Sequence, residues 1–254
     1  MKDSDERRLV ELMKSSSSIL IFTGAGVSTS SGIPDFRGPK GIWKTKTPVY
    51  YQDFMASEAA RREYWEQKVE GWDKFRDAQP NAVHRAAVLL ERAEKLHMVV
   101  TQNIDGLHGK AGTSPGRLVE LHGTMSAVEC QTCGRRDEPD PYYREFCETG
   151  TPPRCSCGGY MKSATISFGQ NLRQSDLKRA FSAAELSDLV IALGSTLAVT
   201  PAAHVPLQAA TRGVPYVIIN RGRTEHDHHP QVTLRLEGDV GEIFPRAVEK
   251  ALSS

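Results

Sequence analysis

The chain has 254 residues, of which 39% are hydrophobic, so it can bury a core and is neither a disordered tail nor a small disulfide scaffold. Its 32 Lys plus Arg residues balance 31 Asp plus Glu residues, and the formal net charge of +1 excludes a general attraction to nucleic acid. The charged N-terminus lacks a signal-peptide pattern, and no run reaches the roughly 18 apolar residues of a membrane span. We therefore expect a cytoplasmic protein with no membrane and no nucleic-acid partner.

Apolar periodicity at residues 9–13 predicts a first helix. Four short, continuous apolar runs follow it, at residues 19–22, 98–100, 189–193 and 216–219. Continuous apolarity is typical of strands that are buried on both faces of a parallel sheet. Helical patterns at residues 82–96 and 177–185 lie between these runs. The order predicts an α/β protein with a Rossmann-like, doubly wound parallel sheet.

Two stretches interrupt this order of strands and helices. Residues 41–79 are rich in aromatic and charged side chains, and residues 124–162 hold every cysteine. We expect both to form a smaller lobe, the first part helical and the second part a zinc ribbon. The prediction for residues 1–254 is one domain, with a Rossmann-like core at approximately 1–40, 80–123 and 163–254.

The cysteine spacing indicates a metal site. Cys130 and Cys133 form one pair, and Cys155 and Cys157 form a second pair. Four thiolates suit a closed tetrahedral Zn²⁺ site, whose role is structural because it leaves no position for water. The second pair is one residue shorter than the usual knuckle, which leaves Cys147 open as a substitute ligand. Ordinary buried thiols are the alternative, whereas an odd number of cysteines argues against a secreted disulfide framework.

Small and polar residues follow each apolar run, at 23–26, 101–105, 194–196 and Asn220. Ligands of doubly wound sheets bind at the carboxyl ends of the strands, so these residues predict one ligand site. Gly24-x-Gly26-x-x-Thr29 approaches the dinucleotide fingerprint, but it lacks the third glycine and the later acidic residue. A plain tight turn remains the alternative for this motif taken alone.

A longer string of motifs lies at residues 24–28, 32–37, 101–108, 122–123, 168–169 and 194–197, together with the paired cysteines. In this order and spacing they resemble the sirtuins, the NAD-dependent protein-lysine deacylases, in a minimal catalytic core of prokaryotic type. The resemblance runs from about Ser18 to Val248. Residues 38–43 resemble the short cofactor loop of the chromatin-associated sirtuin branch.

The resemblance implies that NAD is consumed as a cosubstrate and lies across the strand ends. It implies NAD contacts from Gly24, Ala25, Gly26, Ser28, Asp35, Phe36, Arg37, Gln102, Asn103, Asp105, Gly194, Ser195, Thr196, Asn220, Asp239 and Val240. It implies substrate contacts from Ile166, Phe168 and Gly169, and catalytic roles for His122, Asn103 and Asp105. Without the resemblance, Asp105 would equally be a helix cap.

The implied reaction begins when the acyl oxygen of a modified lysine attacks C1′ of the nicotinamide ribose and expels nicotinamide. His122 then deprotonates a ribose hydroxyl, a task that suits an imidazole with a pKa of about 6.5, and the acyl group passes to ADP-ribose. The implied partners are acylated protein lysines. Taken without the resemblance, His122 would more often be a structural histidine.

Two departures from the commonest family pattern are Ser163 in place of a proline and Gln170 in place of a glutamate, and they leave the peptide preference open. Protein mono-ADP-ribosyl transfer or NAD hydrolysis is the alternative activity on the same fold. A catalytically silent module that binds NAD or acyl-peptide is the alternative from another class. The sequence does not determine the acyl-chain length, the substrates or the oligomeric state.

Overall fold

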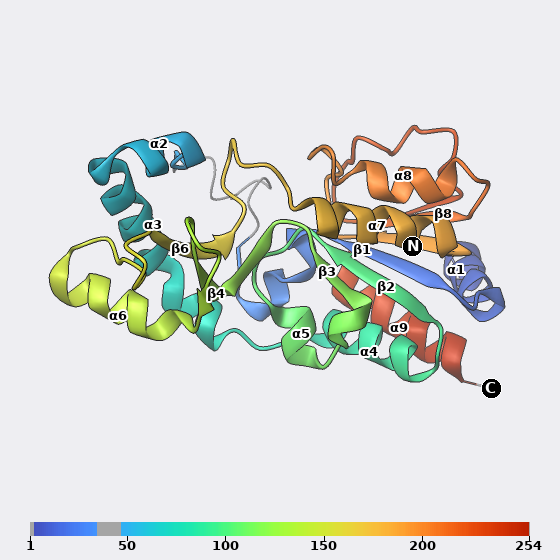
Figure 1. Cartoon of the computed structure of the whole chain (residues 1–254). Coiled ribbons are helices and arrows are strands. Elements are labelled where there is room, and N and C mark those ends of the chain that lie inside the picture. The colour runs from blue at the N-terminus through green and yellow to red at the C-terminus, as the bar shows by residue number, and fades with distance from the viewer. Residues whose placement is uncertain (1–2, 35–46, 254) are drawn as a thin grey trace.

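The computed structural model describes residues 3–34 and 47–253 and has a large α/β part with a smaller lobe beside it (Figure 1). The large part contains a six-stranded sheet in the order β3-β2-β1-β7-β8-β9, and every neighbouring pair is parallel. The predicted doubly wound parallel sheet is thereby confirmed. Its strands are β1 (Ile19–Thr23), β2 (Leu96–Thr101), β3 (Leu118–Glu120), β7 (Leu189–Leu193), β8 (Tyr216–Asn220) and β9 (Leu234–Glu237).

Alternate side chains of the central strands pack on opposite faces of this sheet. In β1, Ile19 and Ile21 join one core and Leu20 and Phe22 join the other. Each of these side chains is fully buried, which contributes about 1.5–3 kcal/mol relative to exposure. The first core is covered by α1 (Asp3–Ser15), α4 (Ala82–Arg92) and α9 (Val240–Leu252), and the second by α7 (Gln174–Leu186) and α8 (His204–Ala210). Burial on both faces explains why these runs are continuously apolar.

The sequence prediction was incomplete at the sheet edges. The edge strands β3 and β9 are short and carry charged residues, so their apolar pattern is weak. The helix expected over 82–96 ends at Arg92 instead. Glu94 has a positive φ of 58°, which turns the chain, and Leu96 already begins β2.

The smaller lobe contains an antiparallel sheet in the order β5-β4-β6. Its elements are α2 (Tyr51–Ala56), α3 (Glu58–Asp77), β4 (Gly123–Cys130), β5 (Arg136–Asp137), α6 (Pro139–Thr149) and β6 (Met161–Thr165). Aromatic side chains fill its core, where the rings of Trp72 and Tyr143 stack with centroids 4.2 Å apart. Among the described residues, no helix is both long and apolar enough to cross a bilayer.

The chain enters and leaves the cysteine-bearing part of this lobe at one place. Strand β4 begins directly after His122, and the chain returns at Ile166, directly after β6. The Ile166 backbone N–H donates to the His122 carbonyl over 2.8 Å. This hydrogen bond places both residues at the boundary between the two parts.

Candidate active site

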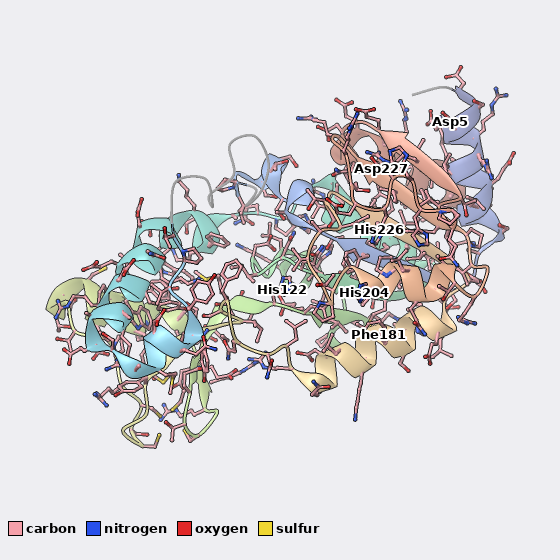
Figure 2. The ribbon with its side chains drawn as sticks, turned by 90° about the horizontal axis from the view of Figure 1, so that it is seen from above. Asp5, His122, Phe181, His204, His226 and Asp227 are labelled. Atoms are coloured by element: carbon pink, nitrogen blue, oxygen red, sulfur yellow. The ribbon has the colours of Figure 1, made fainter. Side chains whose placement is uncertain are left out.

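A cleft of about 1230 Å³ lies at the carboxyl ends of the parallel strands, and His122 lies between the large part and the smaller lobe (Figure 2). Of the site residues predicted from the sequence, the cleft wall contains Gly24, Ala25, Gly26, Gln102, Asn103, His122, Ile166, Phe168, Gly169, Gly194, Ser195, Thr196, Asn220, Asp239 and Val240. The structure therefore brings these predicted residues together in one cleft. Asp35, Phe36 and Arg37, and the cofactor loop at 38–43, lie outside the described residues.

The turn after β1 is held against the turn after β7 by glycines. The Gly26 N–H donates to the Gly194 carbonyl over 2.8 Å. A Cβ at Gly24 would lie 2.7 Å from that carbonyl oxygen, and a Cβ at Gly26 would lie 2.8 Å from it. Gly194 itself has a positive φ of 59°, a conformation that other residues rarely adopt. The close contact between the two turns therefore explains why glycine stands at positions 24, 26 and 194.

Gln102 and Asn103 follow β2 and connect it to the neighbouring turns. Gln102 Nε2 donates to Ser195 Oγ over 2.8 Å. Asn103 Nδ2 donates to the Gly24 carbonyl and to Ser28 Oγ. Asn103 Oδ1 is buried and has no hydrogen-bond partner among the described residues. A buried acceptor without a partner is costly, so this oxygen is suited to a donor on a ligand.

Asp105 and Ser28 lie behind the cleft wall. Ser28 Oγ donates to Asp105 Oδ2 over 2.7 Å, and the Leu107 N–H donates to Asp105 Oδ1 over 2.9 Å. Asp105 is not the N-cap of the short helix α5 (Leu107–Ala111), because Gly106 holds that position; it lies one residue earlier and accepts the N–H of the first helical residue. Burial raises the pKa of the Asp105 carboxyl, and the two hydrogen bonds oppose that rise.

His122 has a defined orientation at the centre of the cleft. Its Nδ1 lies 2.9 Å from the Gln102 carbonyl oxygen, which can only accept a hydrogen bond. In the neutral ring Nδ1 therefore carries the proton, and Nε2 is the basic nitrogen. The strand end that supplies Gln102 thus sets the tautomer of the histidine.

Residues after β6 form the wall of the cleft on the side of the smaller lobe. Phe168 remains 38% exposed, and its ring centroid lies 6.0 Å from that of Tyr50. The Gly169 carbonyl accepts a hydrogen bond from Gln52 Nε2 over 3.0 Å, and Gly169 has a positive φ of 77°. The departures noted in the sequence are accommodated: Ser163 hydrogen-bonds the Tyr143 hydroxyl, and Gln170 accepts from the Ser167 N–H.

The far end of the cleft is formed after β8 and before α9. Asp239 Oδ1 caps α9 by accepting the Gly241 N–H over 2.7 Å, while Asp239 Oδ2 pairs with Arg221. Arg221 and Arg223 line this end of the cleft and were missed by the sequence reasoning. Their position directly after Asn220 at a strand end was the signal that could have found them.

The four predicted cysteines meet in the smaller lobe. The sulfur atoms of Cys130, Cys133, Cys155 and Cys157 all lie within 4.8 Å of one another, with Cys130 to Cys157 at 3.6 Å and Cys133 to Cys155 at 3.8 Å. A tetrahedron with Zn–S bonds of about 2.3 Å has edges of about 3.8 Å, so the cluster fits Zn²⁺. Cys147 is exposed on α6 and does not belong to the cluster.

Glycine again provides the space around these sulfur atoms. A Cβ at Gly159 would lie 2.7 Å from Cys130 Sγ. The single residue between Cys155 and Cys157 is accommodated by a tight turn in which the Gly158 N–H donates to the Cys155 carbonyl. Gly158 has a positive φ of 83°.

The fold and the site define a class of protein: a dinucleotide-binding protein with a structural metal. The features that define it are the Rossmann-like sheet, the cleft at its strand ends and the four-cysteine lobe. Residues 24–201 match the model of the Sir2 family. The chain belongs to the Sir2 family.

The NAD-dependent protein deacetylase of Rhodopseudomonas palustris is 41% identical over 95% of both chains. A solved Sir2 complex with deacetylated p53 peptide and 3′-O-acetyl ADP ribose has a TM-score of 0.88 and 34% identity, covering 98% of this chain and 100% of that one. A complex of Sir2 with p53 peptide and NAD⁺ has a TM-score of 0.86 and 33% identity, covering 98% of each chain.

Proposed function

We propose that this chain is an NAD-dependent protein-lysine deacylase that transfers the acyl group of a modified lysine to ADP-ribose and releases nicotinamide. The observation that carries the proposal is the position of His122. Its ring lines the cleft that the strand ends share with the Ile166–Phe168–Gly169 segment, and its tautomer leaves Nε2 basic. One imidazole can thus serve a dinucleotide on one side and a peptide on the other.

The strand ends are suited to hold NAD. The turn of Gly24, Ala25 and Gly26 lines the cleft, so a pyrophosphate can approach its backbone there. Gln102 and Ser195 offer polar groups to a ribose, and the unpartnered Asn103 Oδ1 suits the amide N–H of a carboxamide. Bound NAD supplies the glycosidic bond that is broken, with nicotinamide as the leaving group.

Asp105 and Ser28 act from behind the wall in this proposal. The Asp105 carboxylate is buried, and in a desolvated environment a negative charge interacts strongly with a developing cation. Ser28 Oγ hydrogen-bonds both Asp105 and Asn103, so it fixes the position of the Asp105 carboxylate relative to the Asn103 side chain, where the carboxamide of NAD would bind. We therefore assign Asp105 to electrostatic stabilisation of the ribosyl centre.

The peptide is expected to pair with the segment after β6. The Ile166 carbonyl would accept the amide N–H of the acyl-lysine, Phe168 would cover the lysine chain, and Gly169 would allow a peptide backbone to approach. His122 then removes a proton from a ribose hydroxyl through Nε2. That oxygen attacks the acyl carbon, the lysine amine leaves with the proton, and a water molecule then adds to the acyl carbon, which supplies the oxygen that completes O-acyl-ADP-ribose.

The four-cysteine cluster would hold Zn²⁺ in a structural role. Cys130, Cys133, Cys155 and Cys157 supply four thiolates, so no open position remains for a water or a substrate. The metal therefore takes no part in the acyl transfer. The cytoplasmic location, the absence of a nucleic-acid partner and the lobe boundaries remain predictions from the sequence.

The direct test is mass spectrometry of the products from an acetylated peptide and NAD. An O-acyl-ADP-ribose species is expected, and His122→Ala should reduce its formation by about 10²–10⁴-fold, the usual contribution of a general base. The matched control is His228→Ala, which removes an exposed imidazole from a surface loop.

Isotopically labelled NAD separates the competing activities in the same assay. Label that remains on the protein would indicate mono-ADP-ribosyl transfer, and free ADP-ribose without acyl transfer would indicate NAD hydrolysis. Binding of NAD without turnover would indicate a silent module. Any of these three results, found without O-acyl-ADP-ribose, would contradict the proposed function.

A further inference from the structure

A buried histidine lies behind the ends of β1 and β2 and is not part of the cleft wall. His108 on α5 is 2% exposed, and its Nε2 lies 3.2 Å from Thr23 Oγ1 at the end of β1. The Thr23 hydroxyl donates to Thr101 Oγ1, at the end of β2, over 2.8 Å. A hydroxyl whose hydrogen is engaged can only accept, so His108 Nε2 carries a proton and donates to Thr23. The histidine therefore has a defined tautomer.

The chain of hydrogen bonds continues to a residue of the cleft wall. Thr101 Oγ1 also accepts the backbone N–H of Asn103 over 3.0 Å. Thr23 and Thr101 are partners in the register of the parallel strands β1 and β2, which brings their hydroxyls together. Both threonines are buried, and a hydrogen bond shielded from water is stronger than an exposed one. Three hydrogen bonds thus connect the imidazole of His108 to the backbone of Asn103.

A second imidazole packs against the first. The rings of His84 and His108 have centroids 4.7 Å apart. The Asn81 N–H donates to His84 Nδ1 over 3.2 Å, so His84 Nε2 carries the proton. Burial lowers the pKa of both imidazoles, to about 4 for His84, so both rings are uncharged at neutral pH. Within the described part of the chain, His84 Nε2 and His108 Nδ1 have no partner, which leaves the pair one donor and one acceptor. The two rings are therefore complementary in the tautomer that Thr23 requires.

Asn103 is the end of this chain of hydrogen bonds that reaches the cleft. Its Nδ2 is held by the Gly24 carbonyl and by Ser28 Oγ, and its backbone N–H is held by Thr101. Its Oδ1 has no partner among the described residues and is the atom that would accept the carboxamide N–H of NAD. A misplacement of about 1 Å costs about 10²-fold in rate, so the backbone anchor of Asn103 matters to the site.

We propose that His108 is a positioning residue for the binding of NAD. Through Thr23 and Thr101 it fixes the backbone of Asn103, and it thereby sets the position of the oxygen that accepts the carboxamide N–H. His108 itself touches neither the dinucleotide nor the peptide. The inference rests on the proposed function, because that function places the nicotinamide at Asn103.

The test is calorimetric binding of two unreactive ligands to the intact protein, each with an acetylated peptide present. One ligand is a carbocyclic analogue of NAD that cannot release nicotinamide, and the other is ADP-ribose, which has no carboxamide. His108→Leu removes the first donor of the chain of hydrogen bonds, so it should weaken the analogue about tenfold and ADP-ribose by less than about threefold. Equal weakening of the two ligands, or none, would overturn the inference.

Thr23→Val breaks the same connection without changing the histidine. It should give the same selective loss, and it decides the question if a thermal melt shows that His108→Leu is not folded. Unchanged binding of the analogue by folded Thr23→Val would also overturn the inference.

Thr101 offers a conservative variant and a matched control. Thr101→Val should weaken the analogue selectively, whereas Thr101→Ser keeps the hydroxyl and should bind both ligands within about threefold of wild type. Thr233→Val is the control, because Thr233 Oγ1 also accepts a backbone N–H, that of Tyr216 at the start of β8, the end of the strand opposite the cleft. A selective loss in Thr233→Val or in Thr101→Ser would contradict the role given to the Thr101 hydroxyl.

The double variant His108→Leu/Thr101→Val shows whether the two residues act through one connection. Its selective loss should be no larger than that of the more severe single variant, since either change interrupts the same chain of hydrogen bonds. Losses that multiply would show independent effects and would refute the inference.

Nicotinamide release from NAD by the wild-type protein, measured separately, tests the proposed function. Its absence would refute deacylation. Its presence, together with equal losses for the analogue and for ADP-ribose in the variants, would refute the role of His108 and leave deacylation standing.

Discussion

The contact between the turns after β1 and β7 can be probed by Gly26→Ala. The added Cβ would lie 2.8 Å from the Gly194 carbonyl oxygen, whereas ordinary contacts begin near 3.4 Å, so the two turns must separate by about 0.6 Å. Overpacking of this kind costs about 1–3 kcal/mol of unfolding free energy. It also lengthens the 2.8 Å hydrogen bond from the Gly26 N–H to the Gly194 carbonyl, and a displacement of about 1 Å is worth about 10²-fold in rate.

The assay is thermal unfolding together with calorimetric binding of NAD. Gly26→Ala should lower the unfolding temperature by about 3 °C per kcal/mol lost and weaken NAD binding about tenfold. Gly71→Ala is the control, because a Cβ at Gly71 meets nothing within 4 Å on α3 and alanine favours a helix by about 1 kcal/mol. Wild-type stability and NAD affinity in Gly26→Ala would refute the steric reasoning.

Two further predictions concern Glu120 and the cysteines. Burial, helped by the Asp105 charge, raises the pKa of Glu120 to about 7 from 4.5, so the folded state loses stability as the pH rises between these values, and the loss is complete above pH 7. Glutamine cannot ionise, so Glu120→Gln should remove about 2–3 kcal/mol of this loss. Chemical denaturation should therefore show a higher unfolding free energy than wild type at pH 8 and no difference at pH 4.5. Equal gains at both pH values would contradict the prediction. Metal analysis should return about one zinc per chain. Cys155→Ser should lose the zinc and part of the circular dichroism signal of the smaller lobe, whereas Cys147→Ser should keep the zinc. Loss of zinc from Cys147→Ser would show that Cys147 is a ligand.

The central strands were predictable because burial on both faces leaves a continuous apolar run. This physical rule located β1, β2, β7 and β8, and it failed for β3 and β9, which lie at the sheet edges and carry charged side chains such as Glu120 and Arg235. The end of α4 was also missed, because the chain turns at Glu94 through a positive φ, a conformation that a glutamate in the sequence does not predict.

The position of a site residue was predictable where that residue follows a strand of the parallel sheet. Residues at the strand ends meet because parallel strands share an edge, so His122, Asn103 and Asn220 could be assigned to one cleft. The withdrawal of Asp105 behind the wall could not be inferred, since it depends on a hydrogen bond to Ser28, which lies 77 residues away in the sequence. The raised pKa of Glu120 likewise arises from the tertiary structure, through burial and the nearby charge of Asp105.

Strand β4 joins two centres that differ in chemistry. It starts directly after His122 and ends at Cys130, so about 26 Å of extended backbone connects the proposed base to a thiolate of the metal cluster. None of the four cysteines lines the cleft, so we expect damage to the thiolates to reach the imidazole through this strand and not by blocking either substrate. An oxidant or a competing soft cation is expected to act as a noncompetitive inhibitor, which would make the rate of deacylation a reporter of thiol redox state.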